Sequence, residues 1–146
     1  SYKYLLFGNC LIRRSVFNTI KLNKKMLSYG GEELDFSYRL NRLFPKMIKA
    51  SPFSVVLRQN HPSLSEHCLR LFDFGRGNFF LLNEQMKLDV VRFQFLLKFR
   101  FLLRPFNSAL YLLCSFLNKS DLGFLSLYTI RLQLLSSVLK GYYSGS

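Results

Sequence analysis

The sequence predicts an α/β fold that continues into a helical C-terminal segment, and three patterns support this. Residues 2–7 and 53–58 are short apolar runs that end at turn residues, as strands do. Between them, apolar residues recur from Phe36 to Phe44 at the spacing of one helical face. After residue 93 the chain is strongly apolar over stretches too long for single strands.

The chain is strongly basic throughout its length. Its 146 residues carry a net charge of +13, with 13 Lys/Arg against 6 Asp/Glu in residues 1–84 and 8 against 2 in residues 85–146. Such a charge attracts polyanions, namely nucleic acid, anionic lipid headgroups or phosphorylated substrates. A solvated basic surface without a specific partner is the alternative.

What the sequence lacks disfavours several classes of protein. The three cysteines are far apart and odd in number, which indicates neither a zinc site nor a disulfide framework, so buried free thiols are expected. No signal peptide opens the chain. Because Ser1 begins in a strand-like run without an initiator Met, we expect the chain to be a piece of a longer protein.

The first long helix is predicted to begin at an acidic turn. Glu32, Glu33 and Asp35 fall in its first turn, where the helix dipole favours negative charge. Asp35 and Arg39 have the spacing of a stabilising ion pair, and Pro45 ends the helix.

A second long helix is predicted after residue 62. Ser63 and Glu66 have the spacing of a capping box, and one apolar face then continues to Phe79. Gly75 and Gly77 are expected to weaken the middle of this helix, since Gly is a poor helix former.

The C-terminal stretches 93–117 and 122–139 are predicted to be helices that lie at a membrane surface. Both are apolar, yet they contain charges such as Lys98, Arg104 and Arg131. Charges near the centre of a spanning helix are costly, so a pair of helices in the interface, or partly re-entrant, fits better. The alternative is a water-soluble helical subdomain whose apolar faces pack on the rest of the protein.

Three motifs, in order and at matching spacing, resemble those of family-2 glycosyltransferases of the GT-A type. Residues 7–17 contain Gly-Asn followed by Arg-Arg-Ser, and residues 29–40 contain Gly-Gly, then Glu-Glu-Leu-Asp and Arg-Leu. Residues 58–77 contain His-Pro-Ser-Leu followed by Phe-Gly-Arg-Gly. The resemblance covers residues 2–84.

The resemblance implies an enzyme that transfers a sugar, with inversion, from a nucleotide-sugar donor to a hydroxyl of a glycan or lipid-linked acceptor. Residues 1–84 would be the acceptor-side C-terminal half of the GT-A domain, and residues 85–146 a basic amphipathic tail on the membrane. The enzyme would build a bacterial surface polysaccharide or glycolipid at the cytoplasmic face of the cell membrane, with no nucleic acid partner.

By the same resemblance, Glu33 is the catalytic base and Glu32 binds or orients the acceptor. A base is needed because the acceptor hydroxyl loses its proton as it attacks the sugar carbon. The family commonly has Asp where Glu33 stands. The alternative for these acids is an ordinary charged first helical turn.

Further residues are assigned by resemblance to the substrates and to a metal. Mg²⁺ or Mn²⁺ is expected in the full-length enzyme, with its main ligands in an Asp-x-Asp motif that these 146 residues lack, so the chain alone is expected to be inactive. For His61 the alternative is a solvated loop histidine, and for Arg76 it is an ordinary surface arginine. The substrate-binding candidates are Asn9, Gly31, Asp35 and Arg76, and the candidate metal ligand is His61.

Two functions of other classes compete with sugar transfer. One is a non-catalytic module that binds anionic lipid through its basic amphipathic helices. The other is a nucleic-acid-binding protein, since basic residues alternate with Phe and Tyr, although no nucleic-acid-binding signature is present.

Overall fold

The computed structural model describes residues 10–49, 62–119 and 126–145, and every regular element in these ranges is helical. Three of these eight elements have six residues or fewer: two α-helices, of six and five residues, and a 3-10 helix of four. In chain order the elements are α1 (Arg14–Thr19), α2 (Glu32–Leu43), α3 (Leu64–Arg76), η3 (Asn78–Leu81), α4 (Glu84–Val91), α5 (Gln94–Lys98), α6 (Arg100–Lys119) and α7 (Ser126–Ser144).

The predicted α/β fold is wrong for this part of the chain. Its helices do not cover a sheet: their apolar stripes pack against one another and form two helix-on-helix clusters. The strands expected at 2–7 and 53–58 lie outside the described residues.

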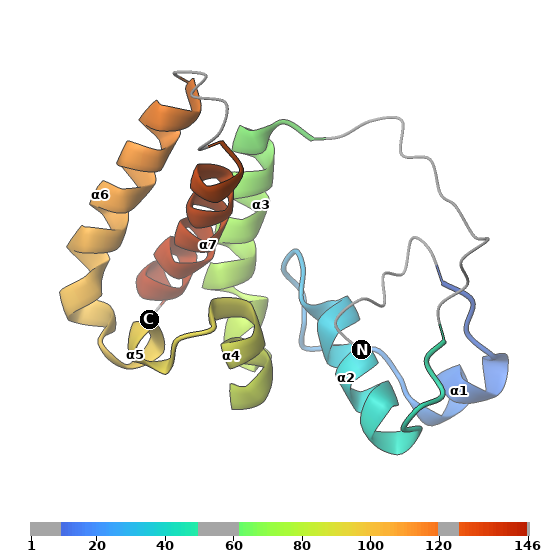
Figure 1. Ribbon diagram of the computed structural model, residues 1–146. Coiled ribbons are helices and arrows are strands. Elements are labelled where there is room, and N and C mark those ends of the chain that lie inside the picture. The colour runs from blue at the N-terminus through green and yellow to red at the C-terminus, as the bar shows by residue number, and fades with distance from the viewer. Residues whose placement is uncertain (1–9, 50–61, 120–125, 146) are drawn as a thin grey trace.

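Three long helices form a layer in which α7 lies between α3 and α6 (Figure 1). α3 and α7 run in the same direction, and α6 runs antiparallel to them (Figure 1). α3 and α7 approach closely at two glycines. A Cβ atom on Gly75 would lie 2.1 Å from the carbonyl oxygen of Val138, and one on Gly141 would lie 2.0 Å from that of Phe72.

The larger hydrophobic core joins this layer to the short helices at one end. Phe79, Met86 and Val91 are fully buried there beside α7. The hydroxyl of Tyr143 donates a hydrogen bond of 2.8 Å to the carbonyl oxygen of Leu96, which ties the end of α7 to α5. Burial of this kind is the main favourable contribution to folding.

The smaller core holds α1 against α2. It contains the buried residues Ile20, Phe36 and Leu40, and the rings of Phe17 and Phe36 are 5.3 Å apart. The loop that precedes α2 is attached to η3 by the side chain of Asn78, which donates to the carbonyl oxygens of Ser28 and of Gly30, the latter at 2.7 Å.

The predicted start of α3 is confirmed and its predicted extent is wrong. Glu66 donates its backbone N–H to the Ser63 hydroxyl, and the Ser63 N–H donates to the Glu66 carboxylate at 2.7 Å, which completes the capping box. The helix ends at Arg76 instead of continuing to Phe79, because the chain leaves helical geometry at Gly77. Gly75 lies inside the helix and gives α7 room to approach.

Candidate functional site

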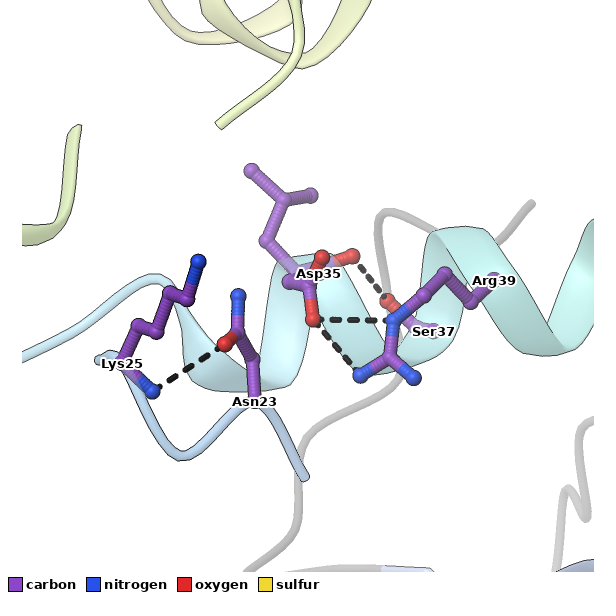
Figure 2. A network of polar contacts seen from close by, with 6 residues as sticks. Asn23, Lys25, Asp35, Ser37 and Arg39 are labelled. Atoms are coloured by element: carbon purple, nitrogen blue, oxygen red, sulfur yellow. Dashed lines mark hydrogen bonds and ion pairs between the residues drawn. The ribbon is translucent and has the colours of Figure 1, made fainter. Parts of the chain in front are cut away.

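The acidic first turn of α2 contains a structural ion pair. Nη2 and Nε of Arg39 both donate to Oδ2 of Asp35, at 2.6 and 3.0 Å (Figure 2). This confirms the predicted pairing of these two residues. In the same region, the Ser37 hydroxyl donates to the carbonyl oxygen of Leu34 at 3.1 Å (Figure 2). Asp35 is buried, so the pair satisfies a carboxylate that would be costly to leave alone.

The two glutamates assigned to sugar transfer precede this ion pair. Oε2 of Glu32 is buried without a hydrogen-bond partner among the described residues. Glu33 lies close enough to Cys10 to influence it: burial, followed by the negative charge of Glu33, raises the pKa of the Cys10 thiol. Both acids therefore lie in a half-buried turn, and Glu33 lies near the Cys10 thiol.

The remaining candidate residues divide between packing positions and positions outside the described chain. Gly31 has a φ angle of +87°, and a Cβ atom there would lie 2.6 Å from the Phe74 ring, so this position needs glycine to pack. Arg76 is exposed at the last residue of α3. Asn9 and His61 lie outside the described residues.

No cation site is apparent in the part of the chain that the structure describes. Nowhere in 10–49, 62–119 and 126–145 do three or more His, Cys, Asp or Glu side chains come together to hold a metal ion. The Mg²⁺ or Mn²⁺ expected in a full-length enzyme would take its main ligands elsewhere, so that expectation stays a prediction.

The most unusual surface of the molecule is the outer face of α6, which is apolar and exposed. α6 forms one edge of the helical layer (Figure 1). Six large apolar side chains on α6 are between 55% and 77% exposed. Their spacing places them along one side of the helix. These six, which we call the outer face, are Phe101, Leu102, Phe106, Leu112, Leu113 and Phe116.

The opposite side of α6, which contacts α7, is partly polar. Asn107 is buried and donates to the carbonyl oxygen of Ser136 at 3.0 Å, and the Ser136 hydroxyl donates back to Asn107 Oδ1 at 2.8 Å. Near the other end, the amide of Asn118 donates to Oε1 of Gln133 at 2.6 Å, and the Thr129 hydroxyl donates to Oδ1 of Asn118. These contacts form a polar seam between α6 and α7.

α6 therefore departs from the usual amphipathic arrangement. A helix of a water-soluble domain normally turns its apolar stripe toward the core and its polar side toward solvent. Here Asn107 is buried in the seam, while the phenylalanines and leucines of the outer face are exposed. Contiguous apolar patches of this kind mark sites of interaction with a protein or a membrane.

Exposed basic side chains occur on α5, α6 and α7. Lys98 is exposed at the last residue of α5, Arg104 is exposed near the start of α6, and Arg131 is exposed on α7 beside Tyr128 and Leu132, which are also exposed. No carboxylate among the described residues pairs with these three cations. The surface thus combines apolar side chains with unneutralised positive charge.

Among the described residues, no helix combines the length and the apolar character needed to cross a bilayer.

Comparison with known proteins gives no support for the predicted family. No family model matches the chain, and no curated protein or solved structure matches it either. Together with the all-helical described region, this overturns the assignment to family-2 glycosyltransferases. Sugar transfer, with the roles of Glu33, Glu32 and Arg76, was inferred from that resemblance and remains an untested prediction.

The sequence pattern alone did not identify the outer face. Apolar and basic residues alternate irregularly after residue 93, and either side of α6 was able to face the core. The polar residues indicate which side of α6 contacts α7. Asn107 and Asn118 are eleven residues apart, which places them on one side of a helix, and Gln133 and Ser136 are three apart on the next helix. Two matching polar stripes predict a polar interface between the helices.

Proposed function

We propose that this chain binds membranes peripherally, with the outer face of α6 lying in the interface of a bilayer that contains anionic lipid. The single observation that carries the proposal is the orientation of α6, which exposes six large apolar side chains and buries Asn107. Helices with a strongly apolar side, a polar side and flanking basic residues lie in the plane of the bilayer interface.

The apolar contribution to binding is substantial. Burial of a Leu or Phe side chain stabilises by roughly 1.5–3 kcal/mol when it is complete. Each side chain of the outer face is more than half exposed and would be only partly covered by lipid. Partial coverage of six such side chains gives several kcal/mol in favour of the bound state.

The charge of the chain favours a lipid partner over an uncharged protein surface. Its net charge is +13, and Lys98 and Arg104 are exposed where α5 leads into α6, the helix that carries the outer face. Each Lys or Arg near an anionic leaflet contributes about 1 kcal/mol. The expected location at the cytoplasmic face of the cell membrane belongs to this proposal, because anionic lipid is concentrated in that leaflet.

Co-sedimentation of the chain with vesicles tests the proposal. The chain is expected to bind vesicles of phosphatidylcholine and phosphatidylserine and to bind pure phosphatidylcholine weakly. Changing three leucines of the outer face to glutamine, Leu102→Gln, Leu112→Gln and Leu113→Gln, should abolish the binding. The matched control makes the same change at three exposed leucines of the N-terminal part, Leu11→Gln, Leu22→Gln and Leu27→Gln, and should bind normally.

Two results would contradict the proposal. If the outer-face variant binds vesicles as well as its control does, lipid contacts another surface. If the unmodified chain ignores vesicles but self-associates, and the outer-face variant is monomeric, a second copy of the chain covers α6 in place of lipid.

A further inference from the structure

A cleft of about 500 Å³ lies between α2 and α4, on a part of the molecule that the proposed membrane function does not use. One wall comes from α2 and carries Arg39 and Arg42. The other wall carries Leu81, at the end of η3, and Asn83, at the N-cap of α4, and the end of α1 contributes Thr19 and Ile20. Its volume is within the range typical of sites for small organic ligands.

The cleft carries a net positive charge, because two arginines, Arg39 and Arg42, line it with a single carboxylate, that of Asp35. Arg42 is exposed and forms no ion pair with a carboxylate that the structure describes. Arg39 uses Nε and Nη2 to bind Asp35, which leaves Nη1 available as a donor. The surrounding residues 10–49 contain nine Lys/Arg and three Asp/Glu, so their combined field also attracts an anion.

The wall from α4 adds hydrogen-bond donors. The side-chain oxygen of Asn83 caps α4 by accepting the N–H of Met86 at 2.9 Å. Since this oxygen is occupied, the amide nitrogen is the group that Asn83 can offer to a ligand. The N-terminus of α4 is at the same wall, and its dipole is positive there. Glu84 in that first turn is exposed and forms an ion pair with Lys87, 3.0 Å away.

The remaining lining is apolar. Leu43 and Leu81 are partly exposed along the cleft, and the buried Met86 contributes to its wall. A bare inorganic anion would leave this surface uncovered. A ligand with one anionic group and a small apolar body would cover it and also meet the guanidinium groups.

We infer that this cleft binds a phosphate monoester whose organic part is small and apolar. Guanidinium groups suit phosphate oxygens because they donate several hydrogen bonds in a planar fork. Arg42, the free nitrogen of Arg39 and the amide of Asn83 supply donors from both walls, and Leu43 and Leu81 contact the organic part. The phosphate belongs either to a free metabolite or to a lipid headgroup.

Titration with phenyl phosphate tests the site, because this probe combines a phosphate with a small apolar ring. In ¹H–¹⁵N spectra at constant ionic strength, saturable shifts are expected for residues 39–43 and 83–86. Arg42→Gln should weaken the affinity roughly tenfold, as expected for the loss of a charge-assisted contact. Arg14→Gln, which removes an exposed arginine of α1 outside the cleft, should leave it nearly unchanged.

A second pair of variants isolates the charge of the cleft. Glutamate and glutamine side chains have the same size, and Leu81 is partly exposed, so the variants Leu81→Glu and Leu81→Gln are both expected to fold. Leu81→Glu should abolish binding of phenyl phosphate, and Leu81→Gln should retain most of it. An equal effect of the two variants, or an equal effect of Arg42→Gln and Arg14→Gln, would refute the site.

Vesicles distinguish the two sources of phosphate. If the ligand is a lipid headgroup, Arg42→Gln weakens binding to phosphatidylcholine vesicles that contain phosphatidic acid, and phenyl phosphate competes. If the ligand is a free metabolite, phenyl phosphate binds the cleft without changing vesicle binding. The absence of saturable binding of phenyl phosphate together with no effect of Arg42→Gln on vesicles would overturn the inference. The titration with phenyl phosphate does not depend on the outer face of α6, so failure of the cleft and failure of the proposed membrane binding are distinguishable.

Discussion

Gly75 of α3 lies directly against the backbone of α7, where a Cβ atom added to it would be 2.1 Å from the carbonyl oxygen of Val138. Gly141 of α7 has the reciprocal relationship with Phe72 of α3, at 2.0 Å. Two glycines, one from each helix, thus allow the backbones of α3 and α7 to touch. Neither distance is possible for a real Cβ atom, and backbone atoms cannot move aside as flexible side chains do.

Gly75→Ala therefore provides a test of the packing between α3 and α7. Helix propensity alone predicts a gain of about 1 kcal/mol when Ala replaces Gly inside a helix. The clash with Val138 predicts the opposite sign, a loss of about 1–3 kcal/mol from overpacking. Urea unfolding followed by circular dichroism measures the difference. Asp73→Ala, at an exposed position of the same helix, should change stability by less than about 0.5 kcal/mol.

The features of this fold that the sequence predicts are those that depend on contacts between residues close together in the chain. The capping box at Ser63 and the Asp35–Arg39 pair were predictable because each involves residues within one helical turn. Gly75 was interpreted as a weak point of a helix, since its partner Val138 is far away in the sequence. The sequence predicted a helix with an apolar surface here but did not identify which residues of α6 face outward, because the contact between Asn107 and Ser136 is not local.

The hydrogen bonds between Asn107 and Ser136 should matter for stability because both side chains are buried. Ser136→Ala leaves the buried Oδ1 of Asn107 without this donor, which should cost about 1–3 kcal/mol. Adding Asn107→Leu removes the unsatisfied group, so the double variant should lose less than the sum of the two single losses. Additive losses in a double-mutant cycle would show that the seam is not energetically coupled.

The basic residues beside the outer face should control the salt dependence of membrane binding. The double variant Lys98→Gln/Arg104→Gln should weaken binding to phosphatidylserine-containing vesicles by roughly tenfold or more, at about 1 kcal/mol for each charge. The remaining binding should depend less on ionic strength. Lys24→Gln/Lys25→Gln removes the same charge from an exposed loop that precedes α2 and should have a smaller effect. Equal losses would indicate a diffuse attraction without a docking face.

Tyr143 should make the fold sensitive to high pH. Burial, followed by the proximity of Tyr142, raises the pKa of Tyr143 to about 12. The folded state therefore keeps a proton that the unfolded state releases near pH 10. The contribution of Tyr143 to the free energy of unfolding is therefore fully present below pH 10 and is lost as the pH rises from 10 to 12. Tyr143→Phe should be less stable at pH 7, through loss of the hydrogen bond to Leu96, and less sensitive to alkali. Parallel pH profiles of the two proteins would exclude this role.

The thiol of Cys114 reports whether α6 stays on α7 when the chain binds a membrane. Cys114 is buried on α6, and burial raises its pKa, so few thiolates are present at pH 8. Iodoacetamide should modify the less buried Cys10 first and Cys114 much more slowly. Peptide mass spectrometry measures both rates in one sample. If α6 binds lipid through its outer face alone, vesicles leave Cys114 protected, because the opposite side of the helix keeps its contacts with α7. Rapid modification of Cys114 on vesicles would mean that α6 separates from α7 and inserts by itself.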